Sequence, residues 1–359
     1  MISEETLFIK DEQLSVVTDA ATLEKALQKK VDSWIVSRGE IFLPCAPALL
    51  ENYMQRLEAL FAILGKPWSK EELERLEQVL ALRLQEGFKT SPHSRIVIHY
   101  ESEDYPTSPS RRLCVKVSSI VETLEQQYKK WVQMREPPLF GTHPDAKVMA
   151  VLGELGEPSK TAILDVGAGT GRNTLPLARM GYPVQALELS PAFVQQLTAV
   201  VNSQGLPVMV TAGNVIDPKV KLPTAHYALA IASEVVPHFR SLDELRRFLV
   251  RMSEVLRPGG LLLFNIFLAN DGYEPDQLAR EISELAWSFL FTRADLVTAL
   301  EGLPLELISD ESTLEYERQH LPPEAWPPTG WFEHWASGQD LFLIKNPPMQ
   351  LRWLLYRRK

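Results

Sequence analysis

The chain has 359 residues, of which 45% are hydrophobic and 23% charged, and its net charge is -9. This length suits two domains, because single cores rarely grow past a few hundred residues before a chain splits. The composition excludes a disordered or fibrous chain. The acidic balance argues against a protein that binds nucleic acid by neutralising many phosphates, so we expect no nucleic-acid partner.

Cysteine content and hydropathy further limit the class of protein to which the chain can belong. The two cysteines, Cys45 and Cys114, lie far apart, and neither belongs to a CxxC motif or a Cys/His cluster. We therefore expect neither a disulfide framework nor a metal site. The first residues, MISEETLFIKDEQ, lack a basic segment followed by an apolar one, and no run of about 18 apolar residues occurs. The sequence thus predicts a cytoplasmic protein with no membrane partner.

The first third of the chain has a helical pattern. Apolar residues recur at three- and four-residue intervals from Ala21 to about Lys89, and Ser69 with Glu72 forms a capping box at the start of one helix. A strand-like stretch, SRIVIHYESED, and a Pro/Ser-rich segment follow. We predict that residues 1–115 form a mainly helical accessory region that docks the substrate, and that residues 116–359 form a second domain.

The second domain begins with VKVSSIVETLEQQYKKWVQM, where the spacing again predicts a helix, and REPPLFGTHPD ends it. After residue 160, short apolar runs alternate with amphipathic helices, which is typical of a parallel sheet covered on both faces. The predicted strands are 162–166, 184–188, 208–212, 227–231 and 261–267. The predicted helices are 173–180, 191–202, 242–256 and 293–300.

The end of the chain suggests an antiparallel hairpin. The runs LFLI and MQLRWLLYRR are separated by only the short segment KNPP. We expect these two runs to pair and to close the edge of the sheet.

A glycine-rich loop follows the first predicted strand of this sheet. It reads Asp165-Val-Gly-Ala-Gly-Thr-Gly171 and precedes a helix. Glycines allow a sharp turn and close approach of a ligand, and the helix N-terminus presents free amides. The dinucleotide pattern G-x-G-x-x-G needs a small residue where this chain has Arg172, which argues against a nicotinamide oxidoreductase. Glu188 ends the next strand, where a carboxylate can accept both hydroxyls of a ribose.

These motifs, together with GNVID, ALAIASEVVPHF and LRPGG, occur in an order that resembles the class I (Rossmann-like) S-adenosylmethionine-dependent methyltransferases. The resemblance implies an α/β fold with a seven-stranded sheet, six strands parallel and one antiparallel. It also implies S-adenosylmethionine as the cofactor. The implied cofactor-binding residues are Asp165, Gly167, Ala168, Gly169, Gly171, Glu188, Leu189, Asn214, Val215 and Ser233.

One position departs from the family pattern. The segment that borders adenine often carries an acid after its glycine, whereas this chain has Asn214 there and Asp217 three residues later. Either the amide replaces the carboxylate or Asp217 takes its role, and position favours Asn214 with Val215.

Methyl transfer from a sulfonium requires mainly alignment and exclusion of water, and a general base near neutral pKa assists a hydroxyl or amine acceptor. We predict that His238 is this base and that the carboxylate of Glu234 orients it. The alternative is that His238 packs over the cofactor or faces solvent.

Two aromatic segments are further candidates. Tyr128, Trp131, Phe140, Gly141 and His143 lie in an element that covers the cofactor in related enzymes, and His143 could equally be a turn cap. The segment 322–335, PPEAWPPTGWFEHW, either forms a lid over the acceptor or plugs a core.

The acceptor is left open by the motifs. SEVV replaces the NPPY type of motif, which argues against adenine in DNA. EPPLFGTHPDAKV and GAGTGRNTLPLAR resemble cyanobacterial methyltransferases that modify an asparagine of phycobiliprotein β-subunits, so a protein acceptor is one expectation. The alternatives are a small-molecule N- or O-methyltransferase and a non-catalytic binding module.

Overall fold

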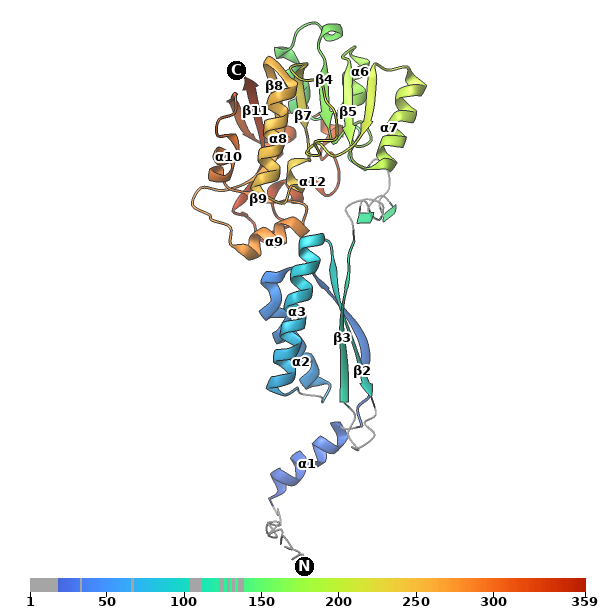
Figure 1. Ribbon diagram of the computed structural model, residues 1–359, viewed down its shortest axis with the longest axis vertical. Helices are drawn as coiled ribbons and strands as arrows, with labels where there is room; N and C mark the ends of the chain where they lie inside the picture. The colour runs from blue at the N-terminus through green and yellow to red at the C-terminus, as the bar shows by residue number, and fades with distance from the viewer. Residues whose placement is uncertain are drawn as a thin grey trace, which may run out of the picture. The chain divides into compact units, whose positions relative to one another are not determined.

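The computed structural model describes residues 19–32, 34–65, 68–103, 112–122, 126–127, 130, 133–134 and 139–359. The chain divides into two compact units. One contains residues 1–43, 50–84 and 96–119, and the other contains residues 44–49, 85–95 and 120–359. Figure 1 labels many of the elements of both.

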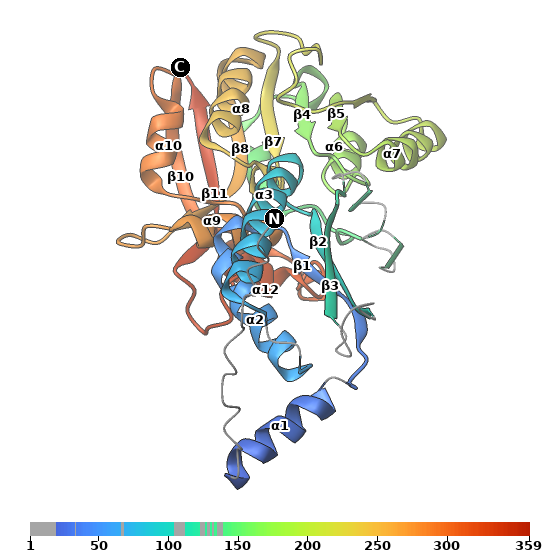
Figure 2. The same cartoon turned by 60° about the horizontal axis from the view of Figure 1, so that its bottom comes forward.

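The first unit combines helices with a small sheet. The elements in this part of the chain are α1 (Ala20–Asp32), β1 (Arg38–Pro44), α2 (Leu50–Ile63), α3 (Lys70–Thr90), β2 (Arg95–Glu103) and β3 (Arg112–Ile120). The strands pair in the order β1-β2-β3, and α2 and α3 lie beside them (Figure 2). The predicted capping box is present: Glu72 N donates to Ser69 Oγ at 3.3 Å and Ser69 N donates to the Glu72 carboxylate at 2.9 Å.

The helices α1, α2 and α3 lie largely within the stretch from Ala21 to about Lys89 that was predicted to be helical, and β2 matches the strand-like stretch. The strand β1, which interrupts the helical stretch, and the strand β3 were not expected. The helix predicted to begin at Val115 is wrong over residues 115–120, which belong to β3. VKVSSI alternates apolar and polar residues at its start, and its β-branched residues favour a strand that can pair with β2.

The second unit is built on a large sheet. Its strands are β4 (Ile163–Val166), β5 (Val184–Glu188), β6 (Val208–Ala212), β7 (Tyr227–Ala232), β8 (Leu256–Ala269), β9 (Leu290–Phe291), β10 (Leu305–Ser312) and β11 (Met349–Arg358). The order is β10-β11-β8-β7-β4-β5-β6, with β9 paired to β8 outside this path. β11 is antiparallel to both of its neighbours. The predicted Rossmann-like sheet, with one antiparallel strand among seven, is confirmed, and β9 adds a two-residue strand.

Helices cover both faces of this sheet. One buried cluster joins strand residues such as Ile163 and Trp353 to helices α5 (Ala146–Val151) and α6 (Thr174–Arg179). The cluster on the opposite face joins Leu164 and Leu354 to α8 (Leu242–Val255) and α10 (Arg293–Leu300). Alternate residues of a strand face opposite sides, so strands buried on both faces must be apolar throughout. The remaining helices are α7 (Pro191–Gln204), α9 (Gln277–Leu285), α11 (Thr313–His320) and α12 (Phe332–Ser337).

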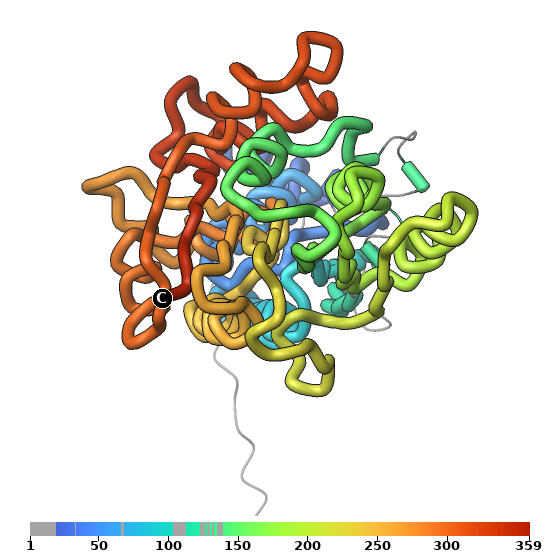
Figure 3. Tube along the Cα trace, turned by 90° about the horizontal axis from the view of Figure 1, so that it is seen from above, coloured from blue at the N-terminus to red at the C-terminus, as the bar shows by residue number. Residues whose placement is uncertain are grey.

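The predicted terminal hairpin is wrong in one partner. Residues 341–344, LFLI, form turns and no strand, and Leu343 is 91% exposed. A strand has two edges, and β11 already pairs with β8 on one and β10 on the other. Residues 313–348 are therefore an insertion between β10 and β11. It runs beside the segment that holds α5 (Figure 3), where Glu317 accepts hydrogen bonds from the main chain of Ala146 and Lys147.

Replacement of a leucine by alanine should have a large effect on stability in the buried strand β11 and almost none in the exposed LFLI segment. Leu354→Ala should lower the free energy of unfolding by about 2 to 5 kcal/mol, because it leaves a cavity in the core. Leu343→Ala should leave it within about 0.5 kcal/mol of the wild type, as surface substitutions do. Chemical unfolding followed by circular dichroism measures both, and a large loss in Leu343→Ala would contradict this account of the chain end.

Candidate functional site

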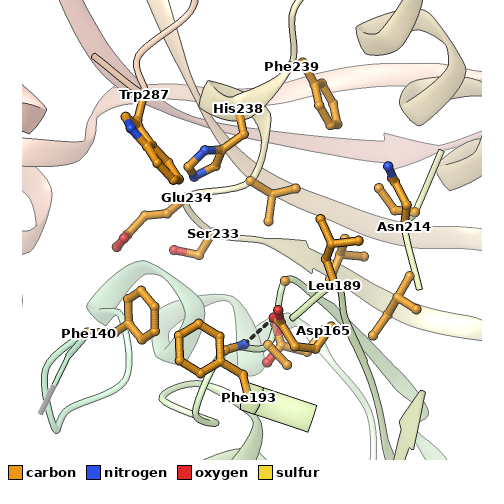
Figure 4. Close-up of a pocket in the computed structure, with 18 of the residues that line it drawn as sticks. Phe140, Asp165, Leu189, Phe193, Asn214, Ser233, Glu234, His238, Phe239 and Trp287 are labelled. Atoms are coloured by element: carbon orange, nitrogen blue, oxygen red, sulfur yellow. Dashed lines mark hydrogen bonds between the residues drawn. The ribbon is translucent and has the colours of Figure 1, made fainter. Parts of the chain in front are cut away.

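A cavity of about 560 Å³ opens where β4, β5, β6 and β7 end. Figure 4 shows side chains from these strand ends pointing into it. The residues predicted from sequence that line it are Asp165, Gly167, Ala168, Gly169, Glu188, Leu189, Asn214, Val215, Ser233, Glu234 and His238. Further aromatic residues of the wall are Phe140, Phe193, Phe239, Trp287, Trp331 and Trp335. Four separate strand ends thus contribute to one site, as in other sheets of this type.

Gly171 was predicted to bind the cofactor but is not among the lining residues. Its φ is +96°, and a Cβ there would lie 2.7 Å from Leu197 Cδ1 and 2.8 Å from Leu175 Cγ. Gly171 therefore lets the loop pack closely against α7 and its own helix.

Glu188 ties the glycine loop to the end of β5. Its two carboxylate oxygens accept hydrogen bonds from Gly169 N at 2.8 Å and Ser190 N at 2.7 Å. Burial raises the pKa of Glu188, while these main-chain bonds act in the opposite direction. The carboxylate is held rigidly at the cavity wall, and each oxygen still has a lone pair to offer.

Asp165 lies at the end of β4 and is 2% exposed. Its carboxylate accepts a hydrogen bond from Thr174 Oγ1 at 2.5 Å. Burial raises the pKa of Asp165 to about 7; the Thr174 bond lowers it and the nearby Asp145 raises it further. The carboxyl of Asp165 therefore keeps its proton up to a higher pH than an ordinary aspartate does.

The guanidinium of Arg172 is a buried cation at the cavity wall. Arg172 forms ion pairs with Asp145 at 3.1 Å and with Glu234 at 2.7 Å. Ser233 completes the group by donating to Asp145 at 2.7 Å. Burial alone would lower the pKa of Arg172, but the two carboxylates raise it, so the guanidinium stays charged. Sequence reasoning used Arg172 only to exclude a dinucleotide site, and it gave no role to Asp145, although Asp145 lies in the segment EPPLFGTHPDAKV.

Glu234 has an unusual backbone. Its φ is +58°, in the left-handed region that side chains rarely adopt. Its main-chain N–H donates to Asn265 Oδ1 at 2.7 Å, and its carboxylate accepts from Arg172 at 2.7 Å. Such strain persists where surrounding contacts enforce it, most often at functional sites.

His238 ends the short 3-10 helix Val236–His238 and packs edge-on against Trp287, with ring centroids 5.0 Å apart. Burial lowers the pKa of His238 to about 4; His93 lowers it too, and a hydrogen bond to the backbone of Glu234 raises it. The imidazole is therefore neutral at pH 7. The Glu234 carboxylate, predicted to orient this ring, pairs with Arg172 instead, and its main chain contacts the ring.

The adenine segment follows β6. Asn214 lines the cavity, and its Oδ1 accepts from Ile216 N at 3.0 Å. Asp217, the alternative, is not among the lining residues, and its carboxylate accepts from Lys219 N at 2.9 Å. Position thus favours Asn214 over Asp217.

Of the candidates upstream of the glycine loop that the structure describes, one lines the cavity and two do not. Tyr128 and Trp131 lie outside the described residues. Phe140 lines the cavity and packs edge-on against Phe193 at 5.4 Å. Gly141 and His143 are not among the lining residues, and His143 Nδ1 lies 3.1 Å from Thr142 Oγ1, as expected of a turn residue.

The tryptophan-rich insertion lines the cavity and also packs into a core. Trp331 and Trp335 line the cavity. Trp335 is also buried against Phe267, with ring centroids 5.1 Å apart, so it anchors the insertion to the sheet. Trp326 packs in the same cluster and is not among the lining residues.

The structure shows neither a candidate metal site nor a membrane-spanning helix among the residues that it describes. Within the described residues, no three His, Cys, Asp or Glu side chains are grouped so as to bind a metal ion. No helix in that same part of the chain has the length and apolar character needed to cross a membrane.

Residues 163–260 match a family model described as a methyltransferase domain. A ubiquinone biosynthesis O-methyltransferase of Rickettsia canadensis (strain McKiel) is 25% identical over 107 residues, which are 30% of this chain and 43% of the relative. The chain thus matches less than half the length of that relative.

Similar solved structures include phosphoethanolamine N-methyltransferase 2 of Haemonchus contortus in complex with S-adenosyl-L-methionine (TM-score 0.49, 14% identity, 69% of this chain and 63% of that chain). Another is a putative sarcosine dimethylglycine methyltransferase of Galdieria sulphuraria (TM-score 0.48, 15% identity, 65% of this chain and 97% of that chain).

The family match spans the glycine loop, Glu188, Asn214 and the strained turn at Glu234. It supports the prediction of a methyltransferase domain over these residues, and the sheet order confirms the predicted Rossmann-like arrangement.

The raised pKa of Asp165 predicts a specific pH dependence. Between pH 3.8 and about 7 the folded carboxyl keeps a proton that the unfolded chain releases, so the free energy of unfolding falls as pH rises. Asp165→Asn removes this contribution. The free energy of unfolding of the variant should therefore fall less steeply with pH than that of the wild type, by up to about 1.4 kcal/mol per pH unit. Chemical unfolding at several pH values tests this, with the exposed Asp271→Asn as control. Parallel curves for wild type and Asp165→Asn would contradict it.

Proposed function

We propose that this chain, whose residues 163–260 form a methyltransferase domain, transfers a methyl group from S-adenosylmethionine to a nitrogen or oxygen atom of an acceptor. One observation carries the proposal: a single cavity collects the glycine loop after β4, the acid that ends β5, the amide after β6 and the strained turn after β7.

The donor set of this cavity suits an adenosyl compound. The remaining lone pairs of Glu188 can accept the two ribose hydroxyls. Leu189 and Val215 offer apolar surface for a flat base, and the amide of Asn214 offers a polar contact. The volume of about 560 Å³ lies within the range of small-molecule sites, roughly 300 to 1,000 Å³.

S-adenosylmethionine, when bound, supplies an electrophilic methyl group on a positively charged sulfur. The chain's own residues must then align the acceptor and exclude water. Arg172 carries one positive charge between two carboxylates, so this wall of the cavity favours a cation over an anion. The aromatic residues of the wall exclude water from the same space.

His238 is the proposed proton acceptor. A neutral imidazole offers one unprotonated nitrogen, which can accept a hydrogen bond from the attacking group and take the proton that it loses. Glu234 acts as its positioning residue through the main chain, since its carboxylate is engaged by Arg172.

A protein is the proposed acceptor, and an asparagine of a phycobiliprotein β-subunit is the specific candidate. The segments EPPLFGTHPDAKV and GAGTGRNTLPLAR support it by their resemblance to enzymes with that substrate. Residues 1–115 offer more chain than methyl transfer to a small molecule requires, and substrate docking is their proposed role.

A small-molecule acceptor is the second candidate. It is favoured by the curated relative, which is a ubiquinone biosynthesis O-methyltransferase. Incubation with isotopically labelled S-adenosylmethionine separates the two candidates. Label on an asparagine of unmethylated phycobiliprotein β-subunit supports the first. Label found only in the low-molecular-weight fraction of a cell extract supports the second.

Cofactor binding should depend on close backbone approach at Gly169. This residue has φ +54°, and a Cβ there would lie 3.3 Å from Phe140. Gly169→Val should abolish the binding of S-adenosylhomocysteine in calorimetric titration, because the side chain fills the space a ligand needs. Gly205→Val is a matched control, since Gly205 has φ +59° with no atom within 4 Å of the added Cβ. Equal binding by both variants would refute the assignment of this loop.

Glu188→Ala should weaken the same binding by about 1 to 3 kcal/mol, or roughly 5- to 150-fold, because a charged hydrogen-bond acceptor is lost. Thermal unfolding of the variant distinguishes a local loss from a collapsed loop. A folded Glu188→Ala protein with wild-type affinity would show that the ribose binds elsewhere.

A further inference from the structure

A second cavity of about 270 Å³ adjoins the first. The two share His238, Phe239, Arg240 and Trp287 in their walls. The rest of the second wall comes largely from residues 90–93, which belong to the same compact unit as the methyltransferase domain. This cavity therefore begins at the proposed proton acceptor and leads away from the cofactor loop.

Aromatic rings dominate its inner wall. The ring of Trp287 lies against His93 at 4.6 Å and against His238 at 5.0 Å. Trp287 has φ +58°, a strained conformation, and its carbonyl accepts a hydrogen bond from Trp335 Nε1 at 3.3 Å. The ring contacts place an indole between two imidazoles, which is a surface suited to a planar group.

The charged groups in this wall are already paired with each other. Arg240 Nε lies 2.7 Å from the Glu284 carboxylate. The same guanidinium donates to the carbonyls of Phe88 at 2.6 Å and Lys89 at 3.5 Å. A charged ligand in the second cavity would thus find both charged side chains of its wall, Arg240 and Glu284, already paired. Burying an ion there without a counter-ion would cost several kcal/mol.

The imidazoles supply the polar contacts instead. Burial lowers the pKa of His93 to about 4, with Arg240 acting in the same direction, and that of His238 also falls to about 4. Both rings are neutral at pH 7, so the unprotonated ring nitrogen of His93 can accept a hydrogen bond. Across the described residues, no hydrogen bond to the ring nitrogens of His93 is present.

We infer that the second cavity binds the methyl-accepting group, that this group is uncharged, planar and a hydrogen-bond donor, and that His93 determines this specificity. The inference rests on the proposed function. It deepens that function by favouring neutral acceptors, such as amides, over ammonium groups and carboxylates.

Three probes of similar shape test it: benzamide, benzylamine and benzoate. Each is titrated into the full-length protein saturated with S-adenosylhomocysteine, and binding is followed by ligand-observed NMR. Benzamide should bind at millimolar concentration, and the two charged probes should bind at least about 10-fold more weakly. Equal binding of a charged probe, or no binding of benzamide, overturns the inference.

His93→Phe keeps a ring but removes the acceptor nitrogen. This substitution should weaken the binding of benzamide about 3- to 10-fold, the effect of one lost hydrogen bond. The affinity for S-adenosylhomocysteine should be unchanged. His226→Phe, at an exposed position that lines neither cavity, is the matched control and should bind benzamide like the wild type. Wild-type affinity for benzamide in a folded His93→Phe protein overturns the role of His93.

The wild-type comparison needs no variant, so it decides the question even if His93→Phe fails to fold. Failure of the two proposals is distinguishable. Binding of S-adenosylhomocysteine without a preference for benzamide removes only this inference. No binding of S-adenosylhomocysteine removes the proposed function, and the inference falls with it.

Discussion

The site depends on one buried cation held between two carboxylates. Arg172 follows β4, Asp145 precedes α5, and Glu234 follows β7, so their ion pairs join three segments that are distant in sequence. Removing one partner of a buried pair costs about 3 to 5 kcal/mol, because the other charge is left uncompensated. Glu234, in the turn that leads to His238, is left-handed, and it is held at both ends: its carboxylate pairs with Arg172, and its main-chain N–H donates to Asn265.

Local pattern predicted the sheet of the second unit well. Short apolar runs and intervening amphipathic helices identify β4 to β8, since buried parallel strands must be apolar on both faces. The terminal hairpin could not be resolved this way, because LFLI has the composition of a strand and only the pairing of β11 with β8 and β10 excludes it. The strand β3 was missed because VKVSSI fits helical and alternating patterns equally over six residues.

The lining of the first cavity was largely predictable, because the glycine loop, Glu188 and Asn214 lie at or just after strand ends and belong to recognisable motifs. Trp287 and His93 were not, since they come from segments that only the fold brings to a cavity. The role of Asp145 likewise appears only when the fold places it against Arg172. The predicted Glu234–His238 contact failed in detail for the same reason: a spacing of four residues shows proximity, but not that Arg172 takes the carboxylate.

In the proposed function, the two cavities together form the path of methyl transfer. One holds the groups suited to an adenosyl compound and the other the groups suited to a neutral acceptor, with His238 and Trp287 at their junction. The crystal structure of the complex with S-adenosylhomocysteine tests this arrangement most directly. The account predicts ribose hydroxyls on Glu188, the base beside Asn214, and the sulfur facing Glu234 and His238. A ligand bound elsewhere, or one whose ribose contacts Asp217 instead of Glu188, would contradict it.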